Sequence, residues 1–187
     1  MRHPAWARAT SSRQALPLSP QPLSMEALAR AIEAQAARAP AAFYRLVLVV
    51  GPPGAGKTAA LREIQGKKGL PLLNLNACLS EKLLELSGQQ RCLKTAELVK
   101  ELVAEQAAEV LMLDNIGILF HPALKQDPLR VLQKAARNQT LIATWQGTLD
   151  GSALTYAAPD HPEFRRIPNP EALIVETSAP DLIGVAG

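Results

Sequence analysis

Residues 51–58 read Gly51-Pro-Pro-Gly-Ala-Gly56-Lys57-Thr58. This stretch matches G-x-x-x-x-G-K-[ST], the loop whose backbone cradles the phosphates of a nucleotide. The apolar run 46–50 precedes the loop, and a helical pattern begins at Lys57. A buried strand, a glycine-rich turn and a helix are the context that the motif requires. The stretch therefore predicts a nucleotide-binding α/β domain.

Each residue type in the loop has a chemical role. Glycines allow backbone angles and close approaches that other residues prevent, so that the amides of the loop and the helix can converge on phosphate oxygens. Lys57 supplies a charge at the β- and γ-phosphates, and the Thr58 hydroxyl is placed to bind Mg²⁺. The predicted ATP contacts are Gly51, Pro52, Pro53, Gly54, Ala55, Gly56, Lys57, Thr58 and Ala59.

A second part of the site is expected at the end of another buried strand. The apolar residues 110–113 are followed by Asp114, which can hold the Mg²⁺ shell beside the phosphate loop. We therefore predict Thr58 and Asp114 as the metal site, with Lys57 and Asp114 taking part in catalysis. Thr144, near the end of a later strand, has two interpretations that stay open: a sensor of the γ-phosphate, or an ordinary strand threonine.

Asn115 occupies the position where hydrolysing ATPases of the AAA+ type carry a glutamate that polarises the attacking water. Asparagine can orient a water molecule but is not a base at neutral pH. Three outcomes stay open at this catalytic position. In the first, ATP hydrolysis is slow. In the second, a carboxylate from elsewhere acts as the base, and in the third the protein binds ATP as a switch and a partner assists its turnover.

Strand and helix patterns alternate along the chain, which predicts a three-layer α/β domain with a mainly parallel sheet and right-handed crossovers. Strands are expected at 45–50, 70–76, 110–115, 140–145 and 172–176, helices at 24–39, 57–65, 79–86, 95–108 and 127–138, and a hairpin turn at Asp150-Gly151. We assign residues 24–176 to this P-loop domain. Residues 1–23, rich in Pro and Ser, are predicted to be a disordered tail, and 177–187 a flexible tail.

Charge gives little support for a surface that binds nucleic acid. The formal net charge of the 187 residues is +3. Residues 1–25 contain three arginines and no acid, so the rest of the chain sums to 3 − 3 = 0. Arg130, Lys134 and Arg137 nevertheless follow one helix face. Three interpretations of this stripe stay open. It is a solvated helix face, it contacts a nucleic-acid phosphate backbone, or its Arg137 is an arginine finger for the ATP of a neighbouring subunit.

The compartment follows from the cofactor and from hydropathy. A protein that uses ATP and Mg²⁺, with Cys78 and Cys92 as separate thiols, is expected in the cytoplasm. No apolar run approaches the roughly 18 residues that cross a membrane, so no membrane association is expected.

Several short segments together resemble one family, BrxF, the small P-loop ATPases of type 3 BREX bacteriophage-exclusion systems. The resemblance covers about residues 25–168. The sequences at the ends of two strands, Asp-Asn-Ile and Thr-Trp-x-Gly, do most to distinguish this family from other P-loop proteins. The segments are Gly51–Thr58, Leu73–Asn76, Leu113–Ile116, Asp127–Arg130, Arg137–Thr140, Thr144–Gly147, Leu154–Tyr156 and His161–Glu163.

The resemblance implies a bacterial cytoplasmic protein that works with other BREX proteins, namely a methyltransferase, a phosphatase-like protein, a large ATPase and a helicase. Compared with full AAA+ proteins, the chain is expected to lack the C-terminal helical lid. We therefore expect a homo-oligomer that completes its ATP sites at interfaces.

Three functions are compatible with these features. The leading one is an ATPase or ATP-driven switch in phage defence, and the second is a nucleotide-gated scaffold with negligible turnover. The third, a small-molecule kinase, is disfavoured because residues 117–127 offer only Lys125 where kinases carry a cationic lid over the phosphates.

Overall fold

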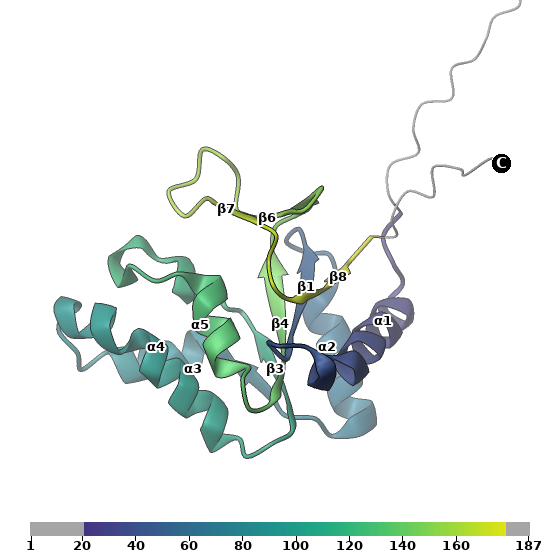
Figure 1. Ribbon diagram of the computed structural model, residues 1–187, viewed down its shortest axis with the longest axis horizontal. Coiled ribbons are helices and arrows are strands. Elements are labelled where there is room, and N and C mark those ends of the chain that lie inside the picture. Colours follow the sequence, from purple (N-terminus) through teal and green to yellow (C-terminus); the bar gives the residue numbers. More distant parts are fainter. Residues whose placement is uncertain (1–20, 179–187) are drawn as a thin grey trace, which may run out of the picture.

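The computed structural model describes residues 21–178, in which a five-stranded parallel sheet is flanked by helices (Figure 1). The strands in their order across the sheet are β2 (Leu72–Asn74), β3 (Val110–Asp114), β4 (Thr140–Gln146), β1 (Leu46–Gly51) and β8 (Leu173–Glu176). The predicted P-loop α/β fold with a mainly parallel sheet is confirmed. Because β4 lies between β1 and β3, it ends between the phosphate loop and Asp114.

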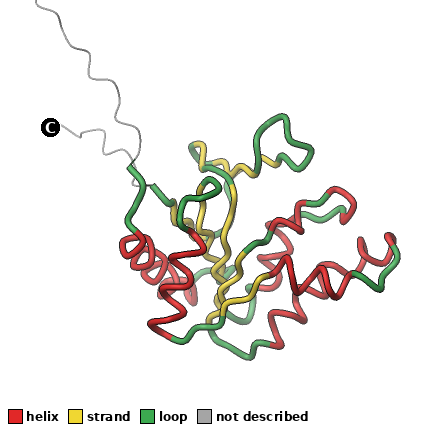
Figure 2. The backbone as a smooth tube through the Cα atoms, turned by 180° about the vertical axis from the view of Figure 1, so that it is seen from behind, coloured by secondary structure: helices red, strands yellow, loops and turns green. Residues whose placement is uncertain are grey.

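Side chains of β1 alternate between two hydrophobic cores, as the side chains of a strand covered on both faces do. Leu46, Leu48 and Val50 belong to the core on one face, and Val47 and Val49 to the core on the other. The first core is covered by α3 (Leu75–Leu83), α4 (Gly88–Glu105) and α5 (Pro128–Ala135), and the second by α1 (Met25–Arg38) and α2 (Lys57–Lys68). The sheet is therefore the middle of three layers, as Figures 1 and 2 show.

Two helices begin earlier than the sequence predicted, because polar side chains cap them. The Asn74 side chain accepts a hydrogen bond from the Ala77 amide at 3.1 Å, so that α3 begins at Leu75 and β2 is shorter than the expected strand 70–76. Ser87 and Gln90 form a reciprocal capping box, so that α4 begins at Gly88 instead of near residue 95.

Four helix ends also differ from prediction, and two of these helices, α3 and α4, end at Leu83 and Glu105, before the expected ends at 86 and 108. Helix α2 continues through Gly66 to Lys68, and Gly69, with φ of 68°, is the residue that ends it. Helix α5 ends at Ala135, before the predicted end near residue 138. The short 3₁₀ segments are η1 (Ala39–Ala41), η2 (Gly117–Phe120) and η3 (Pro122–Leu124).

A second, antiparallel sheet stands on the carboxyl end of β4. It consists of β5 (Leu149–Asp150), β6 (Ala153–Tyr156) and β7 (Arg165–Pro168), in that order. The hairpin at Asp150-Gly151 was predicted, but β7 was not among the predicted strands, because a proline such as Pro168 is uncommon in a strand. Pro168 is compatible with a strand here because β7 lies at the edge of the sheet, where a missing amide is tolerated.

The two ends of the domain pair with each other. Pro22 forms an antiparallel bridge with Ser178, and the Leu23 amide donates to the Thr177 carbonyl at 2.9 Å. The ordered domain thus extends two residues beyond each predicted boundary, 24 and 176. The rest of the predicted tails, residues 1–20 and 179–187, lies outside the described residues. Within 21–178, no helix has the length and apolar character needed to cross a membrane.

Gly147, which joins β4 to the second sheet, allows a close backbone approach. A methyl group at this position would overlap the Thr155 carbonyl oxygen, a backbone atom that cannot turn aside. We expect Gly147→Ala to lower the free energy of unfolding by about 1–3 kcal/mol, as overpacking does, measured by urea denaturation. Gly66→Ala is the control, because nothing lies near Gly66 in α2, and it should stabilise by about 1 kcal/mol. Equal effects of the two variants would contradict this account of Gly147.

Candidate nucleotide-binding site

A cavity of about 860 Å³ opens at the carboxyl edge of the parallel sheet. Its size suits a nucleotide, since ligand pockets typically measure about 300–1,000 Å³. Parallel α/β sheets bind ligands at this edge. The residues around it are Met25, Pro53, Gly54, Ala55, Gly56, Lys57, Thr58, Ala59, Arg62, Glu63, Asn74, Asp114, Asn115, Ile116, Gly117, Thr144, Gln146 and Tyr156. The structure thus brings Pro53 to Ala59, the predicted metal site and the strand ends to one cavity. The predicted contacts Gly51 and Pro52 do not line it, and their carbonyl oxygens accept from Lys57 instead.

The glycines of the loop serve two different purposes. Gly54 and Gly56 have φ of 77° and 78°, a left-handed conformation that other residues rarely adopt. Gly51 is instead the last residue of β1, and a methyl group there would overlap the Thr177 side chain. The loop therefore needs glycine for its backbone shape at two positions and for close packing at the third.

Lys57, the first residue of α2, is buried, with 7% of its surface exposed. Its Nζ donates to the carbonyl oxygens of Gly51 and Pro52, each at 2.6 Å. Burial lowers the pKa of the Lys57 ammonium, and the carboxylate of Asp114 partly opposes that effect. The loop therefore holds a poorly solvated ammonium, which a phosphate oxygen would stabilise by direct charge pairing.

Asp114, Asn115 and Thr144 form one hydrogen-bond network. The buried hydroxyl of Thr144 donates to Asp114 Oδ1 at 2.9 Å and accepts from the Asn115 amide at 3.3 Å. A hydroxyl has a single proton to donate, and that of Thr144 is directed to Asp114 Oδ1. This hydrogen bond holds the carboxylate of Asp114 in one orientation. This geometry gives Thr144 a role that neither interpretation included, the positioning of Asp114, and both interpretations stay predictions.

The backbone at Asn115 turns sharply. Its φ is 54°, in the left-handed region that asparagine tolerates better than most residues, and its carbonyl accepts from the Asn76 amide at 3.0 Å. The carboxylates that line the cavity in the described chain are Asp114 and Glu63. Glu63 lies along α2 and pairs with Lys67 at 2.6 Å, so it is not aimed at the end of the cavity near Asn115.

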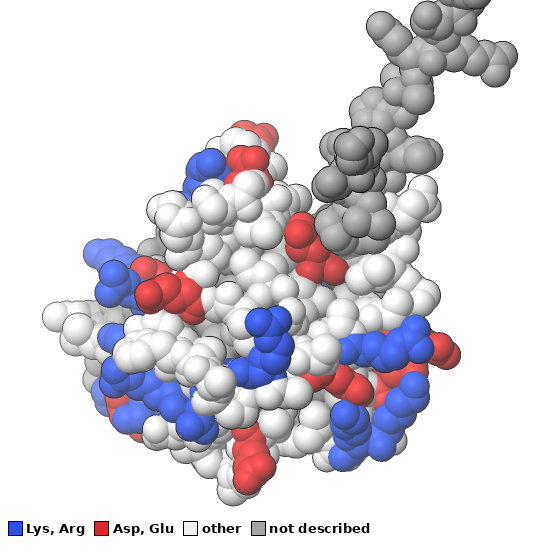
Figure 3. All heavy atoms as spheres, turned by 45° about the vertical axis from the view of Figure 1, so that its right-hand side comes forward, with Lys and Arg blue, Asp and Glu red and all other residues white. Residues whose placement is uncertain are grey.

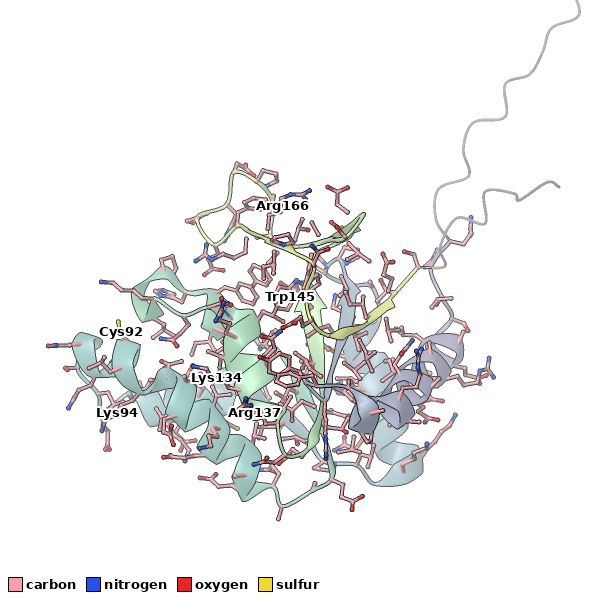
Figure 4. The ribbon with its side chains drawn as sticks, in the orientation of Figure 1. Cys92, Lys94, Lys134, Arg137, Trp145 and Arg166 are labelled. Carbon is pink, nitrogen blue, oxygen red and sulfur yellow. The ribbon has the colours of Figure 1, made fainter. Side chains whose placement is uncertain are left out.

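The structure separates Arg137 from the phosphate loop of its own chain. Helix α5 ends at Ala135 and β4 begins at Thr140, so the exposed Arg137 lies at the amino edge of the sheet. The phosphate loop follows the carboxyl end of β1, which runs parallel to β4. Figure 4 shows Arg137 at the lower end of α5 and Trp145 at the upper end of β4. Arg137 therefore does not take part in the nucleotide cavity of its own chain.

The other two members of the predicted basic stripe also lie away from the phosphate loop. Arg130 pairs with Asp127 at 3.4 Å, and Lys134 is exposed. Figure 3 shows acidic and basic side chains lying among one another over the face in view. These observations agree with the neutral charge sum of the chain after residue 25.

Several residues that line the cavity were not predicted as site residues. Asn74 and Gln146 end β2 and β4, so the rule that ligands bind at carboxyl ends of strands could have indicated them once the strands were assigned. Met25 and Arg62 come from helices α1 and α2. Tyr156 comes from the antiparallel sheet, and no local pattern points to the cavity from there.

The fold and this site define a P-loop nucleoside triphosphatase. The chain belongs to the ATPase family associated with various cellular activities (AAA), whose model matches residues 47–148, and it therefore carries a nucleotide-binding ATPase domain. The structure of C. elegans PCH-2 is similar over 68% of this chain, with 19% sequence identity and a TM-score of 0.35. This chain covers 38% of the length of that one. A comparison with curated proteins gives no match.

Proposed function

We propose that this protein is a Mg²⁺-dependent ATPase or ATP-driven switch, and that it serves a bacterial phage-exclusion system of the BREX type. The observation that carries the enzymatic part is the single cavity shared by Lys57, Thr58, Asp114 and Thr144. Membership in the AAA family supports the same activity. The BREX assignment is supported by the resemblance of the strand-end segments to BrxF.

The residues present fit a magnesium ion bound together with a nucleotide. Mg²⁺ prefers oxygen ligands and is usually held by one or two protein groups plus phosphates and water. Thr58 can supply a hydroxyl and Asp114 a carboxylate, and both line the cavity. When bound, the ion would neutralise charge on the β- and γ-phosphates. The residues of the chain orient the nucleotide, and Thr144 holds the Asp114 carboxylate in place.

Turnover by this site is expected to be slow, because Asn115 cannot take a proton from water at neutral pH. That feature also favours the second function, a nucleotide-gated scaffold with negligible turnover. Phosphate release from the purified protein, alone and with its operon partners, distinguishes the two. Fast release by the isolated protein would contradict the scaffold, and no release under any condition would contradict the ATPase.

Asn115→Asp tests whether a missing base limits turnover. Aspartate has nearly the same size and also tolerates a left-handed backbone, whereas glutamate at a φ of 54° would be strained. We expect phosphate release to rise at least about tenfold, because a positioned general base contributes 10²–10⁴-fold. Asn138→Asp, at the amino edge of the sheet, is the matched control and should leave the rate unchanged. No gain from Asn115→Asp would show that another step limits turnover.

The proposal includes assembly into a homo-oligomer with ATP at subunit interfaces. The exposed Arg137, which lies away from the nucleotide cavity of its own chain, is the arginine that this assembly would place at a neighbour's nucleotide. Sizing the protein with and without a non-hydrolysable ATP analogue tests assembly, and an unchanged monomer in both conditions would contradict it. Co-purification with proteins encoded beside it tests the BREX assignment.

The segment 117–127, where a kinase would carry its cationic lid, gives the kinase alternative no support. Cations above the phosphates are a regular part of phosphoryl-transfer sites. Lys125 is exposed, and in the described chain it is not among the residues that line the cavity. DNA binding is likewise not part of the proposal, because the basic residues outside the tail are balanced by acids.

A further inference from the structure

Tyr156 connects the second sheet to the nucleotide cavity. It ends β6, and of the three antiparallel strands it is the residue that lines the cavity. The neighbouring lining residues are Asn115, Gly117, Thr144 and Gln146, which lie at the ends of β3 and β4 or just beyond them. Tyr156 is therefore placed at the Asp114 end of the cavity, away from Met25 and the body of α2.

The ring of Tyr156 is held in one place. It stacks on Phe120 with 3.3 Å between ring centroids and 4° between the planes, and it meets Trp145 edge to face at 6.0 Å. Only 6% of its surface is exposed. A ring packed in this way cannot turn to suit a ligand, so the position of its hydroxyl is set before the nucleotide arrives.

The hydroxyl group of Tyr156 lies beside Gly117, which also lines the cavity. A methyl group on Gly117 would lie 3.5 Å from Tyr156 Oη and 4.0 Å from Asn115 Oδ1. The phenol and the Asn115 amide thus approach the same point, next to the predicted metal ligand Asp114. Burial raises the pKa of the Tyr156 phenol, and the nearby Glu163 carboxylate adds to that effect, so the group keeps its proton at neutral pH. The phenol is therefore a hydrogen-bond donor at the end of the cavity where the γ-phosphate would lie.

The aromatic cluster also ties Tyr156 to both sheets. Trp145 follows Thr144 on β4, and its indole Nε1 donates to the Thr155 carbonyl at 2.7 Å (Figure 4). Phe120 ends η2, which begins two residues after Asn115. A displacement of Tyr156 would therefore be shared by β6, by the end of β4 and by the segment after β3.

We propose that Tyr156 donates a hydrogen bond to the γ-phosphate of bound ATP. Through this bond, the presence of the γ-phosphate would affect the position of the β5-β6-β7 sheet. The inference rests on the proposed function in one respect, that the cavity binds ATP. A ligand shifts a conformational equilibrium only as far as its contacts differ between the states. A hydrogen bond formed with ATP and absent with ADP is such a difference.

Tyr156→Phe tests the hydroxyl alone, because phenylalanine keeps the stack on Phe120. We expect the variant to bind a non-hydrolysable ATP analogue about tenfold more weakly, as loss of a hydrogen bond to a charged group predicts, with ADP binding changed less than about twofold. Tyr44→Phe is the matched control. Tyr44 lines a separate pocket with Arg130 and Lys134, and its hydroxyl should not affect either nucleotide.

The fluorescence of Trp145 supplies a second measurement. A purely structural role of Tyr156 would not make this fluorescence differ between ATP and ADP. The chain has two tryptophans, so Trp6→Phe leaves Trp145 as the reporter of the aromatic cluster. We expect its emission to differ between the ATP analogue and ADP, and this difference to vanish in the Tyr156→Phe variant.

Three results overturn parts of this account, and they are distinguishable. If Tyr156→Phe weakens both nucleotides equally, or neither, the inference about the γ-phosphate is wrong. If the binding difference is lost but Trp145 emission still distinguishes the nucleotides in the variant, the proposed coupling is wrong. If the parent protein binds no nucleotide at all, the proposed function fails and the inference falls with it.

Discussion

Lys57→Ala is expected to weaken Mg·ATP binding at least about a hundredfold, equivalent to about 2.7 kcal/mol. The ammonium is the charge that the phosphate loop offers to the phosphates, and hydrogen bonds to charged groups contribute about 1.5–3 kcal/mol each. Titration calorimetry with a non-hydrolysable ATP analogue measures the loss. Lys68→Ala is the control, because Lys68 is an exposed residue of the same helix and pairs with Glu33.

The same substitution should leave the fold intact. Burial lowers the pKa of Lys57, which means that folding disfavours the charged form. Its two carbonyl partners keep other donors, since the Gly147 amide donates to Gly51 and the Ala55 amide to Pro52. We therefore expect the melting temperature without nucleotide to be unchanged or higher. A variant that binds ATP like the parent would contradict the nucleotide site, whereas a variant that fails to fold would contradict this account of Lys57.

The sign of the pH dependence follows from the direction of that pKa shift. The pKa of Lys57 in the folded state lies below its ordinary value of 10.5. The group is charged in both states well below the folded pKa, and there the cost of burying the charge is present in full. The cost disappears as the pH rises from the folded pKa towards 10.5, and above that value the group is neutral in both states. Lys57 therefore stabilises the fold least at neutral pH.

The candidate site residues that could be predicted from the sequence are those recognised from their immediate neighbours in the chain. The phosphate loop, Lys57 and Thr58 lie within one motif, and Asp114 stands at the end of an apolar strand, so each could be assigned from its neighbours in the chain. The role of Thr144 could not, because it depends on β4 lying between β1 and β3. Strand order is a property of long-range pairing, and a local pattern does not contain it.

The second sheet shows the same limit. The turn at Asp150-Gly151 has a local signature, and the hairpin was predicted from it. Strand β7 has none, because its partner is selected by cross-strand contacts and because Pro168 suggests a loop. Tyr156 reaches the nucleotide cavity only through this sheet and through its stack on Phe120. Two helix starts were predicted too late for a simpler reason. Asn74 caps α3 from within the predicted strand 70–76, and Ser87 caps α4 from the segment 87–94, to which no element had been assigned.

Asp114→Asn is expected to remove the Mg²⁺ dependence of nucleotide binding and to lower phosphate release about a hundredfold, the upper range for a disturbed metal site. The amide oxygen of asparagine can still accept the hydrogen bond from Thr144, so the network at the strand ends should persist. What is lost is the negative charge, which binds the metal and also supports the protonated form of Lys57.

The measurement compares ATP affinity with Mg²⁺ and with a chelator. The parent should bind more tightly with the metal, and the Asp114→Asn variant equally in both. Asp127→Asn is the matched control, because Asp127 caps α5 outside the cavity and asparagine caps a helix as well as aspartate does. If Asp114→Asn kept the parent's response to Mg²⁺, Asp114 would not be a metal ligand, and its bond to Thr144 would serve only to join β3 to β4. Because the hydrogen bond from Thr144 can persist in the Asp114→Asn variant, this comparison separates the charge of the side chain from the shape of the network.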